Sequence, residues 1–590
     1  MGECEPVFCR IAALELVEVI RRDRLASGGI FALSITKYSG ETPMTDTATP
    51  APAKDPAKGF LGWVERTGNK LPDPVFLFFY LIIVLVIISI IVAFFGGSAT
   101  LSEQVLGGMP DSQKARFSIG SDGVIPAKSL FSAENIARLW VEMPKTFTHF
   151  HPLGYVLVVM LGAGVAERSG LFASAMRSAV RGAPLFLLTP VVALVAMIGN
   201  HAADAAYVVL IPLAGVLFAS AGRHPLAGIA AAFAGVSGGF SANVAPGQLD
   251  ALLYGITEEA GEILVAGYDA NIAGNAYFIL ALLVIYLPLI WFVTDKIIEP
   301  RLGKWVADGE NASYAEEDKP LTEAQRKGLR RAGLAVLGVI ALWLAMTFGP
   351  GTPLINEAAC PAAKAAAGEC SSVANYSDFF KSLVAGFLVL FLATGWVYGK
   401  AAGTIKNHRD LVEMMSDAMK DMGYYLVLAF AAAHFVAMFG WSNLGLISAV
   451  HGANAIESSG LPLPILLGLI VIFSALINLF VGSASAKWAL LAPVMVPMLM
   501  LLGISPDGAT AVYRVGDGAT NIITPLMVYF PLILVFARRW QKDFGLGSLT
   551  AMMIPYSIWM LITGVILVVA WAFLGFDLGP GAPMAYTLPG

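Results

Sequence analysis

The stretch YRVGDGATN, from Tyr513 to Asn521, places a guanidinium and a carboxylate inside a long apolar run. Arg514 and Asp517 are three residues apart, so they share one face of a helix. A carboxylate at the centre of a bilayer costs about 2.5–3.5 kcal/mol on insertion scales, and such groups usually serve a function. Asp517 therefore predicts a cation or proton site. Arg514 either neutralises Asp517 or binds an anionic substrate through its planar fork of donors.

The same stretch contains two helix-breaking glycines, Gly516 and Gly518. Irregular backbone is tolerated at membrane depth only where it lines a protein cavity. We therefore predict a helix that is interrupted within GDGATN and offers oxygen ligands from Asp517, Thr520 and Asn521 to a small hard cation. The helix N-termini at such a break suit a substrate carboxylate.

Two other apolar blocks are interrupted by polar patches, GNHAAD (Gly199 to Asp204) and NLFVGSASAK (Asn478 to Lys487). Asp204 in the first patch, like Asp517, can carry a proton if burial keeps it neutral, or bind sodium if it stays charged. The predicted coupling residues are Asp204, Asp517, Asn200, Asn478 and Asn521. A sodium ion would take its ligands from Asp204, Asn478 and Asp517, and no other cofactor is predicted.

The second patch also offers substrate-binding candidates, each with a structural alternative. Trp488 could stack on an aromatic ring of the substrate or simply fill the core. Ser485 could bind substrate together with Asn478, although small residues here also permit close backbone packing. Lys487 has a stem long enough to snorkel toward the interface, and Pro506 is placed to end the hairpin.

The composition identifies the class of protein that must position these residues. The chain has 590 residues, of which 57% are hydrophobic and 13% charged, against about 25% charged in soluble proteins. Its apolar runs reach about 20 residues, the length that spans a bilayer as a helix. The four cysteines form no CxxC motif and the histidines have no metal-ligand spacing, so a zinc site is not predicted. A net charge of −5 on so long a chain gives no indication of nucleic-acid binding.

We therefore predict an all-α polytopic membrane protein with about nine transmembrane helices and two re-entrant helical hairpins. The spans are predicted at 75–95, 151–168, 225–258, 275–295, 331–348, 378–398, 422–440, 507–537 and 549–575. The hairpins are predicted at 184–221 and 464–503, because each half of these two interrupted blocks is also short enough for a re-entrant arm.

Lysine and arginine gather in the segments that this arrangement places in the cytoplasm, while residues 259–273, 441–463 and 576–590 contain none. The positive-inside rule then predicts a cytoplasmic N-terminus and a periplasmic C-terminus in the inner membrane. Cys360 and Cys370 fall in an external loop, where either a disulfide or two free thiols are possible.

The predicted domain boundaries follow from the same pattern. They are an N-terminal cytoplasmic segment 1–74, a first transmembrane repeat 75–296, a linker with a linking span and an external loop 297–377, a second repeat 378–575 and an external tail 576–590. Residues 1–43 are interpreted as an upstream extension, with a short amphipathic helix as the alternative.

The two halves match each other in order. Asn200 and Asn478 have the same separation as Asn243 and Asn521. Three further pairs share a separation three residues longer, namely Tyr207 with Trp488, Pro212 with Pro493 and Pro225 with Pro506. Four crossings and a linking span make an odd number, so the second copy is predicted to be inverted. Inverted repeats with broken helices at the midplane are a recurrent plan of secondary transporters.

One short motif favours a different class of protein. GVSG, from Gly235 to Gly238, matches the serine motif of intramembrane rhomboid-type proteases, with Ser237 as nucleophile. Such an enzyme needs a histidine base within hydrogen-bond reach, and His201 is the histidine in a nearby segment. The alternative is that GVSGGFSAN forms the break of the first repeat. We predict a transporter and no enzymatic activity.

Four long stretches resemble the AbgT family, the p-aminobenzoyl-glutamate transporters. They are VERTGNKLPDP, GNHAADAAYVVLIPLAG, SASAKWALLAPVMVPML and YRVGDGATNIITPLMVYFPLIL, and they cover both repeats. The resemblance implies a homodimer with a cavity open to the cytoplasm. It also implies uptake of p-aminobenzoyl-glutamate, or export of sulfonamides that mimic p-aminobenzoate. The family's functional positions fall on Asp204, Asn478, Ser485, Trp488, Pro506, Arg514 and Asp517.

Taken together, we expect a secondary active transporter of a small aromatic carboxylate, driven by a proton or sodium gradient. Arg514 and Trp488 would bind the carboxylate and the ring, and Ser485, Pro506 and Asn478 complete the predicted substrate-binding set. A sodium-coupled dicarboxylate transporter is the alternative within the same class, and one arginine beside a tryptophan favours the aromatic mono-anion.

Overall fold

The computed structural model describes residues 73–588 apart from 110, 182, 203–205, 307–319, 349–352, 359–360 and 362–374. The interpretations of residues 1–43, of Asp204 and of Cys360 and Cys370 fall outside the described residues. All described residues belong to one compact unit, Pro56–Gly590.

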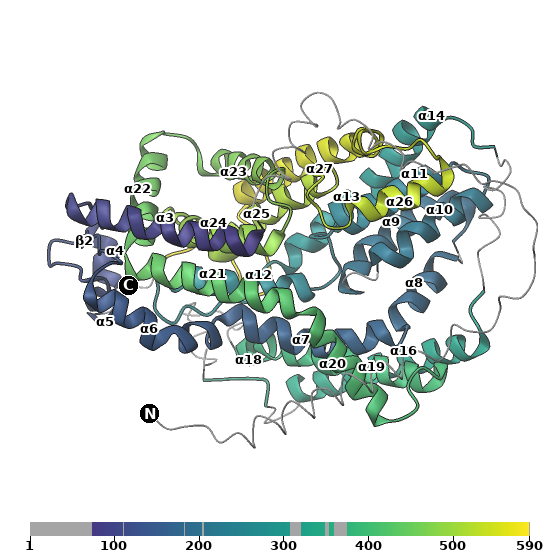
Figure 1. Cartoon of the computed structure of the whole chain (residues 1–590), viewed down its shortest axis with the longest axis horizontal. Helices are drawn as coiled ribbons and strands as arrows, with labels where there is room; N and C mark the ends of the chain where they lie inside the picture. Colours follow the sequence, from purple (N-terminus) through teal and green to yellow (C-terminus); the bar gives the residue numbers. More distant parts are fainter. Residues whose placement is uncertain are drawn as a thin grey trace, which may run out of the picture. The chain divides into compact units, whose positions relative to one another are not determined.

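The described part of the chain is almost entirely helical, which confirms the predicted all-α membrane class (Figure 1). Its named strands, β1 (Ser98–Thr100) and β2 (Val124–Pro126), form one short antiparallel pair with Ala99 opposite Ile125. Within the described ranges, eight helices are long and apolar enough to cross a membrane. The count of nine spans and the inverted repeat therefore stay predictions.

The first half of the described chain begins with a lipid-facing helix and a segment of short elements. These are α3 (Pro74–Phe94), α4 (Glu103–Gly108), α5 (Asp111–Phe117), α6 (Ala133–Thr148), α7 (His151–Arg168) and α8 (Leu171–Arg181). The first interrupted block follows as η1 (Leu185–Leu187), α9 (Leu188–Ile198), η2 (Gly199–Ala202), η3 (Ala206–Leu210) and α10 (Ile211–Ser220). The next span is broken into α11 (Pro225–Phe233), η4 (Ala234–Gly238) and α12 (Gln248–Gly261). It is followed by α13 (Ala276–Val293), η5 (Thr294–Ile298) and α14 (Glu299–Leu302).

The second half has the same succession of long, interrupted and long helices. Its first part comprises α16 (Glu323–Phe348), α18 (Ser377–Lys381), α19 (Leu383–Ala402), α20 (His408–Asp421), α21 (Gly423–Trp441) and α22 (Leu444–Ser458). The second interrupted block is α23 (Leu463–Asn478) and α24 (Ala484–Leu501). A broken span, α25 (Pro506–Asn521) and α26 (Phe530–Trp540), and the long α27 (Leu546–Leu574) complete the half.

Each interrupted block packs against the broken span that follows it. In the first half, α9 contacts α11 and η4, and α10 contacts α11. In the second half, α23 and α24 both contact α25. Helix α12 contacts α7, α24 and α25, so it connects the two halves of the chain near their breaks (Figure 1).

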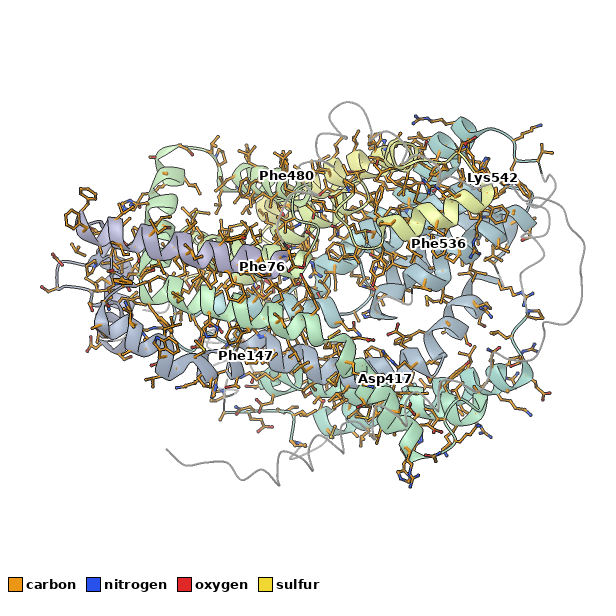
Figure 2. All side chains as sticks on the ribbon, in the orientation of Figure 1. Phe76, Phe147, Asp417, Phe480, Phe536 and Lys542 are labelled. Atoms are coloured by element: carbon orange, nitrogen blue, oxygen red, sulfur yellow. The ribbon has the colours of Figure 1, made fainter. Side chains whose placement is uncertain are left out.

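The outer helices present apolar side chains to the surroundings, as helices in lipid do. On α3, Phe76, labelled in Figure 2, is 58% exposed, and Ile83 is 55% exposed. A soluble protein rarely leaves so long an apolar row uncovered, whereas in a bilayer the acyl chains cover it. These outer faces support the transmembrane assignment of the long apolar helices.

The predicted break within GDGATN is wrong. Helix α25 runs unbroken from Pro506 to Asn521 and is buried throughout the GDGATN stretch, and the interruption comes after it, before α26 begins at Phe530. A β-carbon at Gly516 would lie 2.2 Å from the carbonyl oxygen of Val471, and one at Gly518 would lie 2.9 Å from that of Gly238. These glycines are therefore required for close backbone packing between α25 and its neighbours, as at other interfaces of membrane helices.

This packing predicts a large difference between two glycine substitutions. Gly516→Ala should destabilise the purified protein by about 1–3 kcal/mol, since the new methyl group meets backbone atoms that cannot rotate away. Gly423→Ala at the start of α21 is the matched control, because a β-carbon there meets nothing within 4 Å. Thermal unfolding in detergent measures both, and equal midpoints for the two variants would contradict the role assigned to Gly516.

Candidate functional site

Asn478, at the C-terminal end of α23, connects the second interrupted block to α25. Its Nδ2 amide donates to the carbonyl oxygen of Asp517 (2.7 Å), to Thr520 Oγ1 (2.9 Å) and to Asn521 Oδ1 (2.8 Å). Since the amide carries two hydrogens, these three acceptors share them. Asn478 has no exposed surface, so this network lies in the dry interior.

Lys487 forms an ion pair with Asp517, and both side chains are completely buried. The Lys487 ammonium also donates to Asn478 Oδ1 (2.5 Å) and lies 5.6 Å from the ring centroid of Tyr513. Lys487 does not snorkel, because α24 begins at Ala484 and directs its first turn toward α25 rather than toward an interface. The ammonium thus occupies the position beside Asp517 and Asn478 that the sequence assigned to a coupling cation.

Asp517 is therefore a paired group in a dry cluster and not a bare ligand on a cavity wall. Its second oxygen, Oδ2, is 3.4 Å from Asn521 Nδ2, and Oδ1 is 3.5 Å from the hydroxyl of Tyr513. The Tyr513 hydroxyl donates at 2.6 Å to the carbonyl oxygen of Ala484, at the start of α24. The Lys487 ammonium thus neutralises Asp517 and joins the first turn of α24 to α25.

Arg514 pairs with Asp250 of α12 and not with Asp517. Its Nη2 lies 2.8 Å from Asp250 Oδ1, and the two side chains are 2% and 6% exposed. The other oxygen of Asp250 accepts from the backbone amide of Gly247 (2.8 Å), which fixes the carboxylate at the first turn of α12. The neutralisation of Asp517 by Arg514, one of the two predicted alternatives, is thus wrong.

Two features of Arg514 suit it to an anionic ligand. Its Nε donor is buried without a hydrogen-bond partner among the described residues, and an unmet buried donor is costly. The residue also lines a cavity of about 20 Å³ together with Thr510, Asn275 and Asp507, which is room for about one water.

The sequence analysis did not identify Asp250 and Lys487 as site residues. The acidic residue at the third position of α12, after Gly247, was the available signal for Asp250.

Trp488 is fully buried, and its ring is already stacked on an internal partner. Its centroid lies 4.4 Å from that of Tyr513 at an interplanar angle of 24°. Its Nε1 donates to Thr257 Oγ1 (3.0 Å), which in turn is 2.7 Å from Thr510 Oγ1. Trp488 therefore joins α24, α12 and α25, and one face of its ring is occupied by Tyr513. Its partner Thr257 lines the same cavity as Arg514.

The other predicted residues have more local contacts. Asn200 donates to the carbonyl oxygen of Met197 (3.0 Å) within its own turn, and no contact joins it to Asp517 among the described residues. Ser485 lies partly buried in the first turn of α24, 3.3 Å from Ser483 Oγ. Pro506 is the first residue of α25, where its fixed φ favours helix initiation.

The first interrupted block nevertheless reaches the same region. Tyr207 stacks on Tyr529, which follows α25, with centroids 4.3 Å apart and an interplanar angle of 13°. His201 lies against Gly247, where a β-carbon would be 2.4 Å from Nδ1. Ser237 contacts Met527 Sδ at 3.1 Å, and a thioether cannot act as a general base. The serine-protease interpretation therefore has no support from the environment of Ser237.

The comparisons with known proteins agree with this architecture. A family model described as "AbgT putative transporter family" matches residues 59–586. The p-aminobenzoyl-glutamate transport protein of Escherichia coli is 35% identical over 534 residues, which is 90% of this chain and 98% of that protein.

Two solved structures are also similar. The Alcanivorax borkumensis YdaH transporter is 39% identical with a TM-score of 0.77, over 86% of this chain and all of that one. Neisseria gonorrhoeae MtrF, assigned to a class of antimetabolite efflux pumps, is 40% identical with a TM-score of 0.80, over 89% of this chain and all of that one. These relatives are transport proteins and not enzymes, and the chain belongs to the AbgT family of membrane transporters.

Proposed function

We propose that the protein is a secondary active transporter of p-aminobenzoyl-glutamate and related aromatic carboxylates. The observation that supports this substrate class is the buried Arg514, whose Nε has no partner among the described residues and which lines a cavity with Thr257, the hydrogen-bond partner of Trp488. A guanidinium with an unused donor suits a carboxylate, and a neighbouring aromatic pair suits a benzoyl ring. The similarity to a p-aminobenzoyl-glutamate transport protein supports the same choice.

The coupling site in this proposal is the cluster of Lys487, Asp517 and Asn478. A proton or a sodium ion drives transport by competing with the Lys487 ammonium for Asp517, with Asp204 as the second carboxylate. A sodium ion would take its ligands from Asp204, Asn478 and Asp517. Asn521 and Asn200 are the further coupling residues in this proposal, and Ser485 and Pro506 belong with Arg514 and Trp488 to the substrate-binding set.

A small aliphatic dicarboxylate is a poorer fit than an aromatic carboxylate, because it has no ring to pack against the Trp488–Tyr513 pair. The similarity to MtrF supports export of sulfonamides, which resemble p-aminobenzoate, as an activity of the same site. The proposal includes a homodimer in the inner membrane with a cytoplasmic N-terminus and a periplasmic C-terminus.

Flux in proteoliposomes tests substrate and coupling separately. Labelled p-aminobenzoyl-glutamate, p-aminobenzoate, sulfanilamide and succinate are each offered with a proton gradient or a sodium gradient imposed alone. We expect one gradient to drive the two aromatic carboxylates and neither to drive succinate. If succinate is the only compound transported, the proposed substrate class is wrong. If no compound shows gradient-driven flux, the protein is not a secondary active transporter of these compounds. Protein-free liposomes provide the background.

A further inference from the structure

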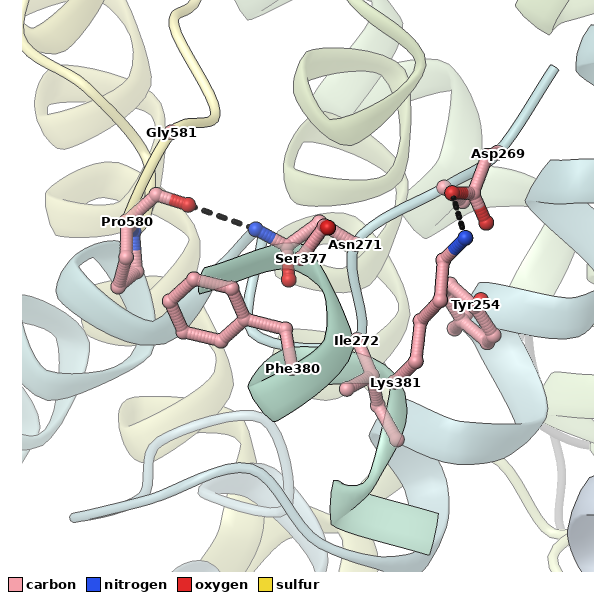
Figure 3. Close-up of a pocket in the computed structure, with 10 residues that line it drawn as sticks. Tyr254, Asp269, Asn271, Ile272, Ser377, Phe380, Lys381, Pro580 and Gly581 are labelled. Carbon is pink, nitrogen blue, oxygen red and sulfur yellow. Dashed lines mark hydrogen bonds and ion pairs between the residues drawn. The ribbon is translucent and has the colours of Figure 1, made fainter. Parts of the chain in front are cut away.

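A second pocket lies on the side of the protein that bears the C-terminal tail; we call it the tail-side pocket. It has a volume of about 210 Å³ and is lined by Tyr254, Asp269, Asn271, Ser377, Phe380 and Lys381, with Pro580 of the tail (Figure 3). These residues come from α12, the loop before α13 and α18, and none was predicted as a site residue.

The tail-side pocket shares a wall with the cavity beside Arg514. Tyr254 and residues 270–272 line both, so the two spaces lie on opposite sides of this part of α12 and of the loop. On the inner side of the wall, Thr510 and Arg514 of α25 line the smaller cavity, which has room for about one water. A displacement of this wall would join the surface pocket to the cavity beside Arg514.

The wall between the two spaces is hydrogen-bonded to the C-terminal tail through Asn271. Asn271 Nδ2 donates to the carbonyl oxygen of Pro580 (2.6 Å), and its Oδ1 accepts from the backbone amide of Ala273 (2.9 Å). Further along, the tail accepts through Met584 from the amide of Ser505 (3.0 Å), the N-cap of α25. The tail thus connects the loop to the start of the helix that carries Arg514.

The lining groups have the chemistry of an aromatic-carboxylate site. The Lys381 ammonium lies 2.5 Å from Asp269 Oδ2, and the two side chains are 52% and 47% exposed. Because that pair is half solvated, exchanging the Asp269 carboxylate for one on a ligand costs little. Phe380 and Tyr254 provide rings, and Ser377 provides a hydroxyl. Residues 259–273 and 576–590 contain no Lys or Arg, so the flanking segments offer no competing cation.

We propose that the tail-side pocket is a second binding site for aromatic carboxylates on the transport path, with Lys381 as the anion-binding residue. The inference rests on the proposed function, since it assigns the same substrate class to a second position. The pocket is smaller than the about 300–1,000 Å³ typical of drug-sized ligands, so it takes a benzoate-sized group. In one direction of transport, the substrate binds in the tail-side pocket before the wall at Asn271 opens toward Arg514. In the other direction, it binds there after it has left Arg514 and the wall has closed.

The test measures binding and flux in four variants of the full-length protein. Lys381→Met keeps the side-chain stem and removes the charge, whereas Lys381→Arg retains the charge. Asp269→Asn releases the ammonium from its partner. Lys420→Met is the matched control, since Lys420 pairs with Asp417 on the exposed surface of α20. p-Aminobenzoate is the charged probe and p-aminobenzamide the neutral one, in titration calorimetry on purified protein and in proteoliposome flux.

We expect Lys381→Met to raise KM for p-aminobenzoate about tenfold, with little change in maximal rate. The variant loses one charge-assisted hydrogen bond to the substrate carboxylate, and a tenfold effect is the size expected for such a bond at a half-exposed site. Asp269→Asn should lower KM several-fold, and Lys381→Arg and Lys420→Met should match the wild type. The neutral probe should not distinguish the variants. Calorimetry should show two equivalents of p-aminobenzoate for the wild type and one for Lys381→Met.

The outcomes separate this inference from the proposed function. If Lys381→Met binds and transports p-aminobenzoate like the wild type, the second site is overturned while the function stands. If wild-type protein neither binds nor transports the aromatic acids, the proposed function fails first. A loss of binding for the neutral probe in Lys381→Met would indicate structural damage and would overturn the electrostatic role of Lys381.

Discussion

Lys487→Met should abolish transport and destabilise the protein by about 3–5 kcal/mol, the cost of leaving one charge of a buried pair without its partner. Lys487 and Asp517 have no exposed surface, so solvent cannot compensate either charge. Asp517→Asn should have the same effect, since it leaves the positive charge of Lys487 unpaired, whereas Lys487→Met leaves the negative charge of Asp517 unpaired. Thermal unfolding in detergent and gradient-driven flux measure the two consequences.

The double variant separates stability from mechanism. Lys487→Met combined with Asp517→Asn removes both charges, so it should recover most of the stability lost in either single variant. It should still fail to respond to a proton or sodium gradient, because no carboxylate remains at this position to take up a proton or to bind sodium together with Asn478. Lys420→Met with Asp417→Asn is the matched control, since that ion pair is exposed on α20 and both measurements should stay unchanged. Gradient-driven flux in the double variant at the wild-type level would remove the pair from the mechanism.

Arg514→Lys should lower kcat/KM for p-aminobenzoyl-glutamate by about 100-fold, near 2.7 kcal/mol, while leaving the fold intact. Lysine keeps the positive charge opposite Asp250, so the buried carboxylate remains paired. It lacks the planar fork and has no equivalent of the unpartnered Nε donor, so the bond proposed for the substrate carboxylate is lost. The loss should fall on carboxylate substrates and be small for p-aminobenzamide.

An exposed arginine provides the control for this substitution. Arg409 is exposed near the start of α20, so Arg409→Lys should transport like the wild type. If Arg514→Lys reduces transport of the carboxylate and of its amide equally, Arg514 acts only through its contact with Asp250. In that case the substrate carboxylate binds elsewhere and the assignment of Arg514 is wrong.

The sequence alone determined the class of the protein and the location of most helices. Long apolar runs and low charge are properties of consecutive residues, so α3, α7, α13, α21 and α27 begin and end within a few residues of the predicted spans. The polar interruptions can also be read from the sequence, because a charged or polar residue within an apolar run is recognised without knowing which helices pack against it. For this reason Asp517, Arg514, Trp488 and Asn478 were identified before any contact was known.

Only the tertiary structure decided which of these groups meet. Arg514 and Asp517 are neighbours on one helix, yet Arg514 pairs with Asp250 of α12 and Asp517 with Lys487 of α24. Gly516 and Gly518 permit close packing instead of breaking α25, because helices approach them from segments distant in sequence. Hydropathy sums the preferences of single residues, whereas the partner of a buried charge depends on which helices pack together, and that is fixed only when the whole chain has folded.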